Sequence, residues 1–318
     1  MSLRQRVQAW FENRLPRTDS LELGQGNIYI VPTRAGFAFA LTLVLMLLAS
    51  INYQLNLGYL LTFLLAGSAL VSMHLTHATL RGLTLRTKAP APVFAGDAAI
   101  LDVTLSSTAS RERHGIGIAL RDPDDGPAWA WVDVPAGGSA TAQVSFVPER
   151  RGLNALPTLV AETHFPLGLF RAWTVWRPAA QALAWPRPET PAAPLPPASP
   201  LPGGSPVARP GQGGEFDGVR AYRRGDTPQR IVWKKVAKSG ELVSRDTRES
   251  ASRELWLDYA ETQLPGTEAR LSRLAAWTVA AERLGLVFGL RLPGVELAPA
   301  TGDAQRRAAL EALARWQS

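Results

Sequence analysis

The chain has 318 residues, of which 46% are hydrophobic and 19% charged, and its formal net charge is +7. This length accommodates about two domains and an anchor. The chain contains no cysteine, which excludes disulfide bonds, thiolate catalysis and zinc–thiolate sites.

The first segment, residues 1–34, begins with an amphipathic pattern over Ser2 to Leu15. Leu3, Val7, Trp10 and Phe11 share one helical face, and Pro16 ends the pattern. Such a helix either lies in a membrane interface or packs on a soluble domain.

Residues 35–80 carry no Asp, Glu, Lys or Arg. Two apolar runs of roughly 18–20 residues flank the polar residues Asn52, Gln54 and Asn56, and each is about 27–30 Å long as a helix, close to the hydrocarbon thickness of a bilayer. A buried helical hairpin of a soluble protein would carry a charged outer stripe, which neither run has. The pattern therefore predicts two transmembrane helices.

Basic residues flank this hairpin on its outer sides. Arginines precede the first run, and Arg81, Arg86 and Lys88 follow the second, whereas the connecting turn has no charge. The positive-inside rule then predicts a multi-pass membrane protein with both termini in the cytoplasm.

Residues 81–185 change to a period of two. Alternating runs at Ile100–Leu105, Ile116–Leu120 and Ala142–Val147 are separated by turn signals. Short strands at this spacing predict an antiparallel β-sandwich. Within it, Phe165–Trp173 is dense in large apolar residues, and this predicts a loop that closes the end of the sandwich or, less favoured, a contact with a membrane or partner.

Residues 186–212 are rich in proline and glycine, and this composition predicts an extended, semi-rigid linker. The basic segment follows. From Arg220 to Arg248 there are nine Lys or Arg against three Asp or Glu, a net of +6. The positive charge of the chain is therefore concentrated in one segment.

Three explanations compete for these basic residues: a solvated face with local ion pairs, a grip on an acidic partner or anionic lipid, and nucleic-acid binding. The anchor argues against the last, so no nucleic acid is expected. The candidate partner-binding residues are Arg220, Tyr222, Arg223, Arg224, Asp226, Arg230, Trp233, Lys234 and Arg245.

The C-terminal residues predict an α/β unit. A short buried strand at Leu255–Tyr259 precedes a helix at Thr267–Leu284 and a second strand at Leu286–Leu292, and Asp303 can cap a last helix. Strands joined by a crossover helix favour a parallel pair.

Several of these segments resemble one bacterial family, the "domain of unknown function 58" proteins. The resemblance rests on Tyr29–Thr33, on Phe165–Phe170 and above all on the motif from Gly214 to Arg245. The family pattern has an acidic residue before Trp233, where this chain has Val232. The resemblance implies a C-terminal unit similar to a von Willebrand factor A domain, and residues 213–318 would hold the basic motif and a truncated unit of this kind. The fold class expected is thus multi-domain α+β: a transmembrane hairpin, a sandwich and this small α/β unit.

The resemblance also implies where a metal would bind. A von Willebrand A site offers oxygen ligands to Mg²⁺ from an Asp-x-Ser-x-Ser loop, and Asp258 and Thr262 match its first and last positions, while Ala260 lacks the expected hydroxyl. The favoured interpretation is that Asp258 caps the following turn, so no cofactor is expected.

The leading functional hypothesis is a non-enzymatic membrane adaptor. The resemblance implies two protein partners beside the bilayer, a MoxR-type AAA+ ATPase and a transglutaminase-like membrane protein. The alternatives are a metal-dependent hydrolase at Asp258 and a binder of anionic lipid or nucleic acid. The chain has no Gly-x-Ser-x-Gly elbow, no His-Glu-x-x-His and no phosphate-binding Gly-Lys-Ser/Thr loop.

Overall fold

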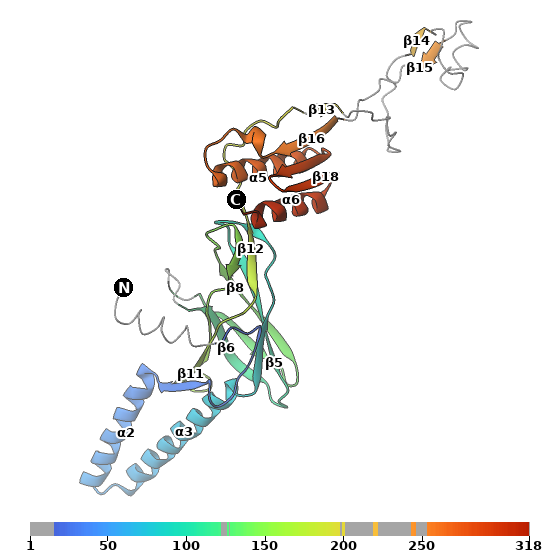
Figure 1. Ribbon diagram of the computed structural model, residues 1–318. Coiled ribbons are helices and arrows are strands. Elements are labelled where there is room, and N and C mark those ends of the chain that lie inside the picture. Colours follow the sequence, from blue (N-terminus) through green and yellow to red (C-terminus); the bar gives the residue numbers. More distant parts are fainter. Residues whose placement is uncertain are drawn as a thin grey trace. The chain divides into compact units, whose positions relative to one another are not determined.

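The computed structural model describes residues 16–121, 126, 128–197, 199–200, 219–221, 243–245 and 253–317. They form two compact units, one within residues 1–188 and 310–318 and one within residues 189–309. The predicted amphipathic segment at Ser2–Leu15 lies outside the described residues. Figure 1 labels the elements of both units.

Two long helices, α2 (Arg34–Asn52) and α3 (Asn56–Leu80), form the predicted helical hairpin. The side chain of Thr33 caps α2 by accepting a hydrogen bond from the backbone N–H of Gly36 at 3.0 Å. The turn between the helices places Gln54 at a φ of 51°, a left-handed conformation that few non-glycine residues adopt. Among the described residues, these two helices are long and apolar enough to cross a membrane.

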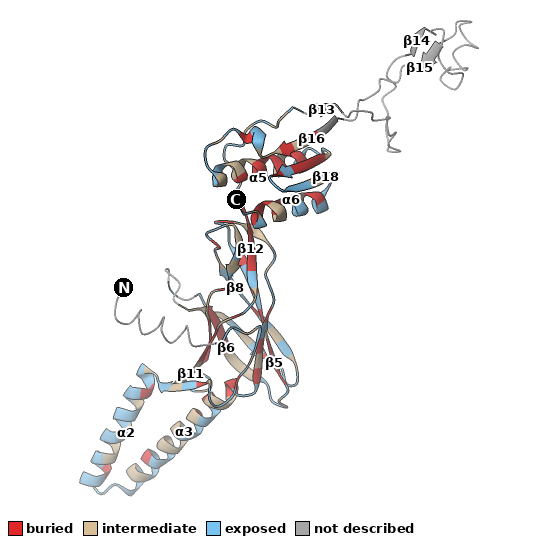
Figure 2. Cartoon of the chain, in the orientation of Figure 1, coloured by how far each residue is buried: buried red, intermediate tan, exposed pale blue. Residues whose placement is uncertain are grey.

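The outward surface of the hairpin is apolar and exposed (Figure 2). Leu57, for example, is 77% exposed. The helices pack through small residues near the turn, where a Cβ atom on Gly58 would overlap the hydroxyl of Ser50. Small residues at a helix–helix contact are typical of helices in lipid, where close backbone approach replaces the hydrophobic driving force.

Two antiparallel sheets follow as a β-sandwich. The first has the order β1-β3-β5-β8 and the second β2-β11-β10-β6-β7. The strands of the first sheet are β1 (Ser20–Glu22), β3 (Leu83–Thr87), β5 (Ala99–Ser107) and β8 (Ser139–Phe146). Those of the second are β2 (Tyr29–Pro32), β6 (Arg113–Leu120), β7 (Ala130–Val134), β10 (Leu159–Thr163) and β11 (Phe170–Trp176). The antiparallel sheets predicted from the period of two are confirmed.

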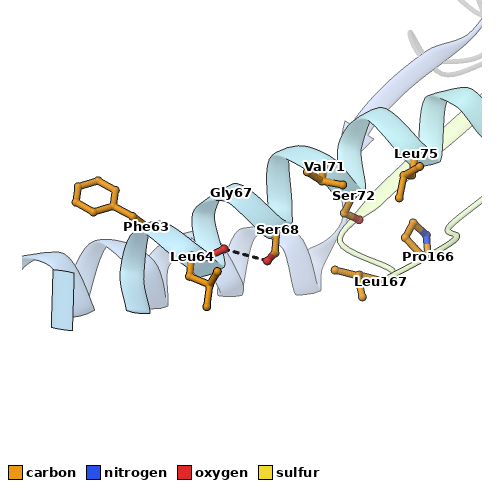
Figure 3. A pocket seen from close by; sticks show the side chains of 9 residues that line it. All are labelled: Phe63, Leu64, Gly67, Ser68, Val71, Ser72, Leu75, Pro166 and Leu167. Carbon is orange, nitrogen blue, oxygen red and sulfur yellow. Dashed lines mark hydrogen bonds between the residues drawn. The ribbon is translucent and has the colours of Figure 1, made fainter. Parts of the chain in front are cut away.

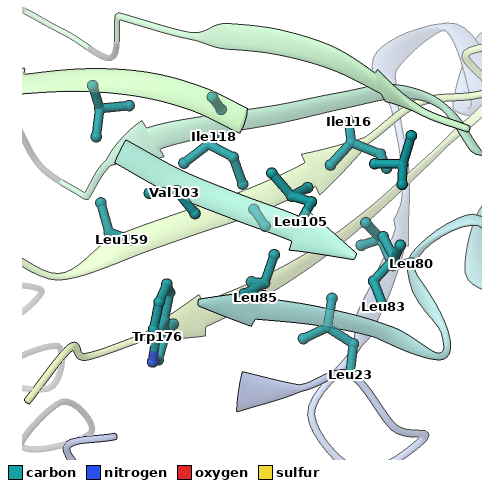
Figure 4. Close-up of a cluster of buried hydrophobic side chains, with 14 of the residues drawn as sticks. Leu23, Leu80, Leu83, Leu85, Val103, Leu105, Ile116, Ile118, Leu159 and Trp176 are labelled. Carbon is teal, nitrogen blue, oxygen red and sulfur yellow. The ribbon is translucent and has the colours of Figure 1, made fainter. Parts of the chain in front are cut away.

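The core of the sandwich lies between the two sheets (Figure 4). Leu101, Val103 and Leu105 alternate with exposed or half-buried residues along β5, as expected for strands with one buried face. Leu80, the last residue of α3, is fully buried in the same cluster. A small third sheet with the order β4-β12-β9 extends this unit, and its strands are β4 (Val93–Phe94), β9 (Gly152–Ala155) and β12 (Gln181–Trp185).

The second unit is built on a four-stranded sheet with the order β13-β16-β17-β18. Its elements are β13 (Ser199–Pro200), β16 (Arg253–Asp258), the 3₁₀ turn η2 (Ala260–Thr262), α5 (Thr267–Arg283), β17 (Phe288–Leu292), β18 (Val295–Ala300) and α6 (Asp303–Arg315), whose last turns extend beyond residue 309. Only β16 and β17 are parallel, with α5 as their crossover. The predicted parallel pair is therefore present.

The helix α5 buries the stripe that its sequence predicts. Leu271, Leu274, Thr278 and Ala281 are all fully buried. Gly285, at a φ of 64°, follows its end, a position that favours glycine because a Cβ atom is strained there.

Part of the predicted linker packs on α5. The backbone N–H of Glu189 donates to the carbonyl of Ser272 at 3.1 Å, and the indole N–H of Trp277 donates to the carbonyl of Pro194 at 3.0 Å. Residues 189–194 thus run along the helix as a bound strap. Proline-rich composition predicts the extended backbone, but it does not reveal that backbone carbonyls find donors on a helix.

Candidate functional site

The predicted partner-binding residues lie almost wholly outside the described residues. Arg220 belongs to β14 (Val219–Ala221) and Arg245 to β15 (Val243–Arg245), and these strands pair antiparallel. The register pairs Arg220 with Ser244 and Arg245 with Val219. The others fall outside the described residues: Tyr222, Arg223, Arg224, Asp226, Arg230, Trp233 and Lys234.

The two metal candidates make local backbone contacts. The Oδ1 atom of Asp258 accepts a hydrogen bond from the backbone N–H of Ala260 at 2.8 Å, and the hydroxyl of fully buried Thr262 donates to the carbonyl of Tyr259 at 2.8 Å. Asp258 therefore makes the turn-capping contact that the sequence favours.

Asp303 is the first residue of α6, and its side chain pairs with two arginines of the same helix. Its carboxylate contacts Arg306 at 2.5 Å and Arg307 at 2.8 Å. The hydrogen bond from Arg306 lowers the pKa of Asp303 below its ordinary value.

The most elaborate set of polar contacts lies where the hairpin meets the sandwich. We call residues Phe165–Leu169, between β10 and β11, the junction loop. Thr33, the cap of α2, donates its backbone N–H to the carbonyl of Leu169 at 2.9 Å and its hydroxyl to the carbonyl of Gly168 at 2.7 Å. The hydroxyl of Thr76 in α3 lies 2.8 Å from the carbonyl of Phe165. One loop thus binds the sandwich-side ends of both helices.

The junction loop also presents apolar side chains to the outside. Leu167 is 58% exposed and Phe165 is 39% exposed. The favoured prediction, a loop that closes the end of the sandwich, describes only part of this arrangement. The exposed tip lies against α3, and apolar residues exposed beside an apolar helix are typical of membrane or protein contacts.

The strand that precedes the junction loop, β10, contains a buried carboxylate. Glu162 of β10 is 5% exposed, and it accepts a hydrogen bond from Nε of Arg171 at 2.5 Å and lies 3.3 Å from Nε2 of His164. Nearby, Arg113 donates to the carbonyl of Ala78, near the end of α3, at 2.5 Å. Charged side chains of the sandwich therefore contact each other and the helix end, as buried charges require.

One cluster of possible metal ligands is present among the described residues, comprising Glu112, His114 and Asp133. Their ligand atoms all lie within 4.8 Å of one another, and Nδ1 of His114 is 3.5 Å from the carboxylate of Asp133 and 4.0 Å from that of Glu112. The backbone N–H of Gly115 donates to Asp133 at 2.7 Å and, together with His114, lowers the pKa of this carboxyl group against the opposing effect of burial. These contacts form a surface ion-pair cluster that needs no ion.

The face of α3 next to the junction loop is hollowed into an apolar groove of about 530 Å³ (Figure 3). We call it the α3 groove. Its lining residues are Phe63, Leu64, Gly67, Ser68, Val71, Ser72, Leu75, Pro166 and Leu167. Ser72 is 1% exposed, and its hydroxyl has no hydrogen-bond partner among the described residues.

The other hydroxyls of the two helices behave differently from that of Ser72. Thr42, Ser50, Thr62, Ser68 and Thr79 each donate to the carbonyl four residues earlier, which is how such side chains satisfy themselves in an apolar helix, and the single hydroxyl hydrogen of Thr76 is shared between the carbonyls of Ser72 and Phe165, each at 2.8 Å. Ser72 is therefore the exception. It lies on the side of α3 that faces Pro166 and Leu167 (Figure 3).

Sequence reasoning did not identify Thr33, Ser72, Thr76 or Arg113. A signal was present for two of them, since Ser72 and Thr76 are polar residues inside an apolar span. Thr76 contacts a carbonyl 89 residues later in the chain, and Ser72 faces the same loop without a hydrogen bond, so spacing alone reveals neither arrangement.

No protein-family model and no curated protein matches this chain. The resemblance to the "domain of unknown function 58" family therefore stays a prediction.

Proposed function

We propose that this protein is a non-enzymatic adaptor anchored in the bacterial inner membrane, which holds its cytoplasmic domains beside the bilayer for a protein partner. The observation that carries the proposal is the exposed apolar surface of α2 and α3, on which residues such as Leu41, Leu57 and Phe63 are more than half exposed. In water such a surface would drive aggregation, whereas in lipid it costs nothing.

The orientation in the proposal follows from flanking charge. Arg34 begins α2, and Arg81 follows α3, so the cations stand at the end that carries the sandwich. The turn at residues 53–55 is uncharged. Under the positive-inside rule the sandwich side is cytoplasmic, as are both termini.

The partner in the proposal is an acidic surface of a protein, and the resemblance suggests a MoxR-type ATPase, with a transglutaminase-like membrane protein as a neighbour. The net charge of +6 over residues 220–248 supports a contact of this chemistry. The competing hypothesis, binding to anionic lipid, is supported by the same positive charge. Experiment distinguishes it from binding to a protein.

Membrane fractionation tests the anchor. We expect the full chain to sediment with membranes, to stay in the pellet after high-salt and alkaline washes, and to be released by detergent. A chain found in the supernatant without detergent would contradict the anchor and with it the whole proposal.

Co-purification tests the partner. We expect the detergent-solubilised full chain to retain the MoxR-type ATPase at low salt, and Arg223→Glu to reduce that retention severalfold by placing a negative charge in the basic segment. Arg150→Glu, a charge reversal at an exposed site outside this segment, serves as the control and should leave retention unchanged. Binding to anionic vesicles without retention of the ATPase would favour the lipid alternative.

A further inference from the structure

The length of the α3 groove along the helix is close to the thickness of one leaflet of a bilayer. The groove runs from Phe63 to Leu75, which is about 18 Å along a helix, and half of the hydrocarbon core is about 15 Å thick. Arg34 lies eighteen residues from Asn52, the end of α2 at the turn, and His74 lies eighteen residues from Asn56, the end of α3 at the turn. The two residues are therefore at the same distance from the turn. The groove therefore extends from near the bilayer midplane to the level of Arg34, where the interface begins.

The polar group of the groove lies at its interfacial end. Ser72 precedes His74 by two residues, so it lies about 3 Å closer to the bilayer midplane along the helix axis. This is the depth at which acyl chains are joined to the glycerol of a phospholipid. The hydroxyl of Ser72 is buried and unpartnered, so it can donate to an ester carbonyl at that depth, and an unsatisfied hydroxyl in an apolar site costs free energy.

The shape of the groove favours an acyl chain over a second helix. Pro166 and Leu167 of the junction loop form its wall at the interfacial end (Figure 3), and a straight transmembrane helix would have to continue past them. In its middle, a Cβ atom on Gly67 would meet nothing within 4 Å. A flexible chain fits a groove that is walled at one end and confined to one leaflet.

We infer that the α3 groove binds one acyl chain of a phospholipid from the leaflet on the sandwich side, with the hydroxyl of Ser72 donating to its ester carbonyl. This inference rests on the membrane anchor of the proposed function. The bound lipid fills the space between α3 and the junction loop, and it satisfies the one serine or threonine hydroxyl of the two helices that has no partner among the described residues.

Photolabelling tests this inference on the full chain. The protein is placed in nanodiscs of phosphatidylethanolamine and phosphatidylglycerol that contain a phosphatidylglycerol with a diazirine in one acyl chain, and labelled peptides are identified by mass spectrometry. We expect labelling of residues 63–75 to exceed that of the exposed surface of α2 severalfold.

Two variants and a control sharpen the test. Gly67→Leu fills the groove and should reduce labelling of residues 63–75 by at least about fivefold, while Ser72→Ala, which leaves the packing intact, should reduce it about threefold, the average effect of one hydrogen bond between side chains in a membrane protein. Ala40→Leu, the same enlargement on the exposed side of α2, should have no effect.

Each other result overturns the inference. Even labelling of both helices that the two variants do not change would show ordinary surrounding lipid, and it would leave the anchor standing. Disulfide cross-links between two copies of a Gly67→Cys variant would show that a helix fills the groove. Absence of label from both helices, with the chain in the supernatant, would overturn the anchor as well.

Discussion

Gly36 marks the closest approach between the hairpin and the sandwich. A Cβ atom at this position would overlap the carbonyl oxygen of Leu169, the oxygen that also accepts the backbone N–H of Thr33. The helix start and the junction loop can therefore come together only because residue 36 has no side chain. Gly67, on α3, has open space in the corresponding direction.

We predict opposite effects for alanine at these two glycines. Gly36→Ala should destabilise the protein by about 1–3 kcal/mol, because either the loop or the start of α2 must shift to accommodate the methyl group. Gly67→Ala should be neutral or stabilising by up to about 1 kcal/mol, because alanine favours the helix. Thermal unfolding of both variants in the same detergent measures the difference, and equal midpoints would contradict the close contact at Leu169.

At the scale of elements, the strap of residues 189–194 is held to α5 by an ion pair. The Nε and Nη2 atoms of Arg273 donate to the two carboxylate oxygens of Glu189, each at 2.9 Å. The hydrogen bond from Arg273 lowers the pKa of Glu189, and the same bond raises that of Arg273, in each case against a smaller opposing effect of burial. Arg273 also donates to the carbonyl of Thr262 at 2.9 Å, so it joins the strap to the turn after β16.

This ion pair predicts a pH dependence. Because the pKa of Glu189 is lower in the folded protein, its contribution is complete above the unfolded pKa, about 4.3, and is lost as the pH falls through the folded value. Glu189→Gln should raise hydrogen exchange of the backbone of residues 267–283 at pH 7, and the difference from the natural protein should shrink as the pH falls through the lowered pKa of Glu189. The effect should be small because both side chains are partly exposed.

A second variant in α5 serves as the control for this prediction. Glu268→Gln, an acid removed from the first turn of the same helix, is the matched control. If it changed exchange over residues 267–283 with the same pH profile, loss of a negative charge at the helix would explain the result, and the ion pair would not.

Some features of this chain can be predicted from its sequence because each depends on a pattern within a short stretch of residues. The hairpin follows from a long uncharged stretch, and the buried stripe of α5 from the spacing of Leu271, Leu274 and Thr278. The strands at Ile100–Leu105 and Ile116–Leu120 follow from alternation. The junction cannot be predicted in this way, since the contacts of Thr33 and Thr76 join a side chain to a backbone carbonyl 135 and 89 residues away, and a carbonyl carries no sequence signal.

At the scale of the whole molecule, the proposed orientation places the turn between α2 and α3 on the far side of the membrane and the elements outside the hairpin on the near side. The absence of cysteine makes this directly measurable, because any introduced thiol is the only one in the chain. Gln54 lies in the turn between α2 and α3, and Arg150 is exposed in the sandwich.

We predict that a membrane-impermeant maleimide labels Gln54→Cys in intact spheroplasts and labels Arg150→Cys only after the membrane is permeabilised. The expectation follows from the arginines at the sandwich end of the hairpin. Labelling of Arg150→Cys in intact spheroplasts, with Gln54→Cys protected, would mean that the hairpin has the reverse orientation.

The position of the junction loop in the chain has a consequence for biogenesis. Thr76 is synthesised 89 residues before Phe165, which at 5–20 residues per second is a delay of roughly 4–18 s. During that interval both membrane helices exist without the segment that fixes their ends. With the proposed anchor, insertion into the bilayer and docking of the sandwich are thus separate events in time, and a defect in the loop would yield a chain that is inserted but whose sandwich is not docked on the hairpin.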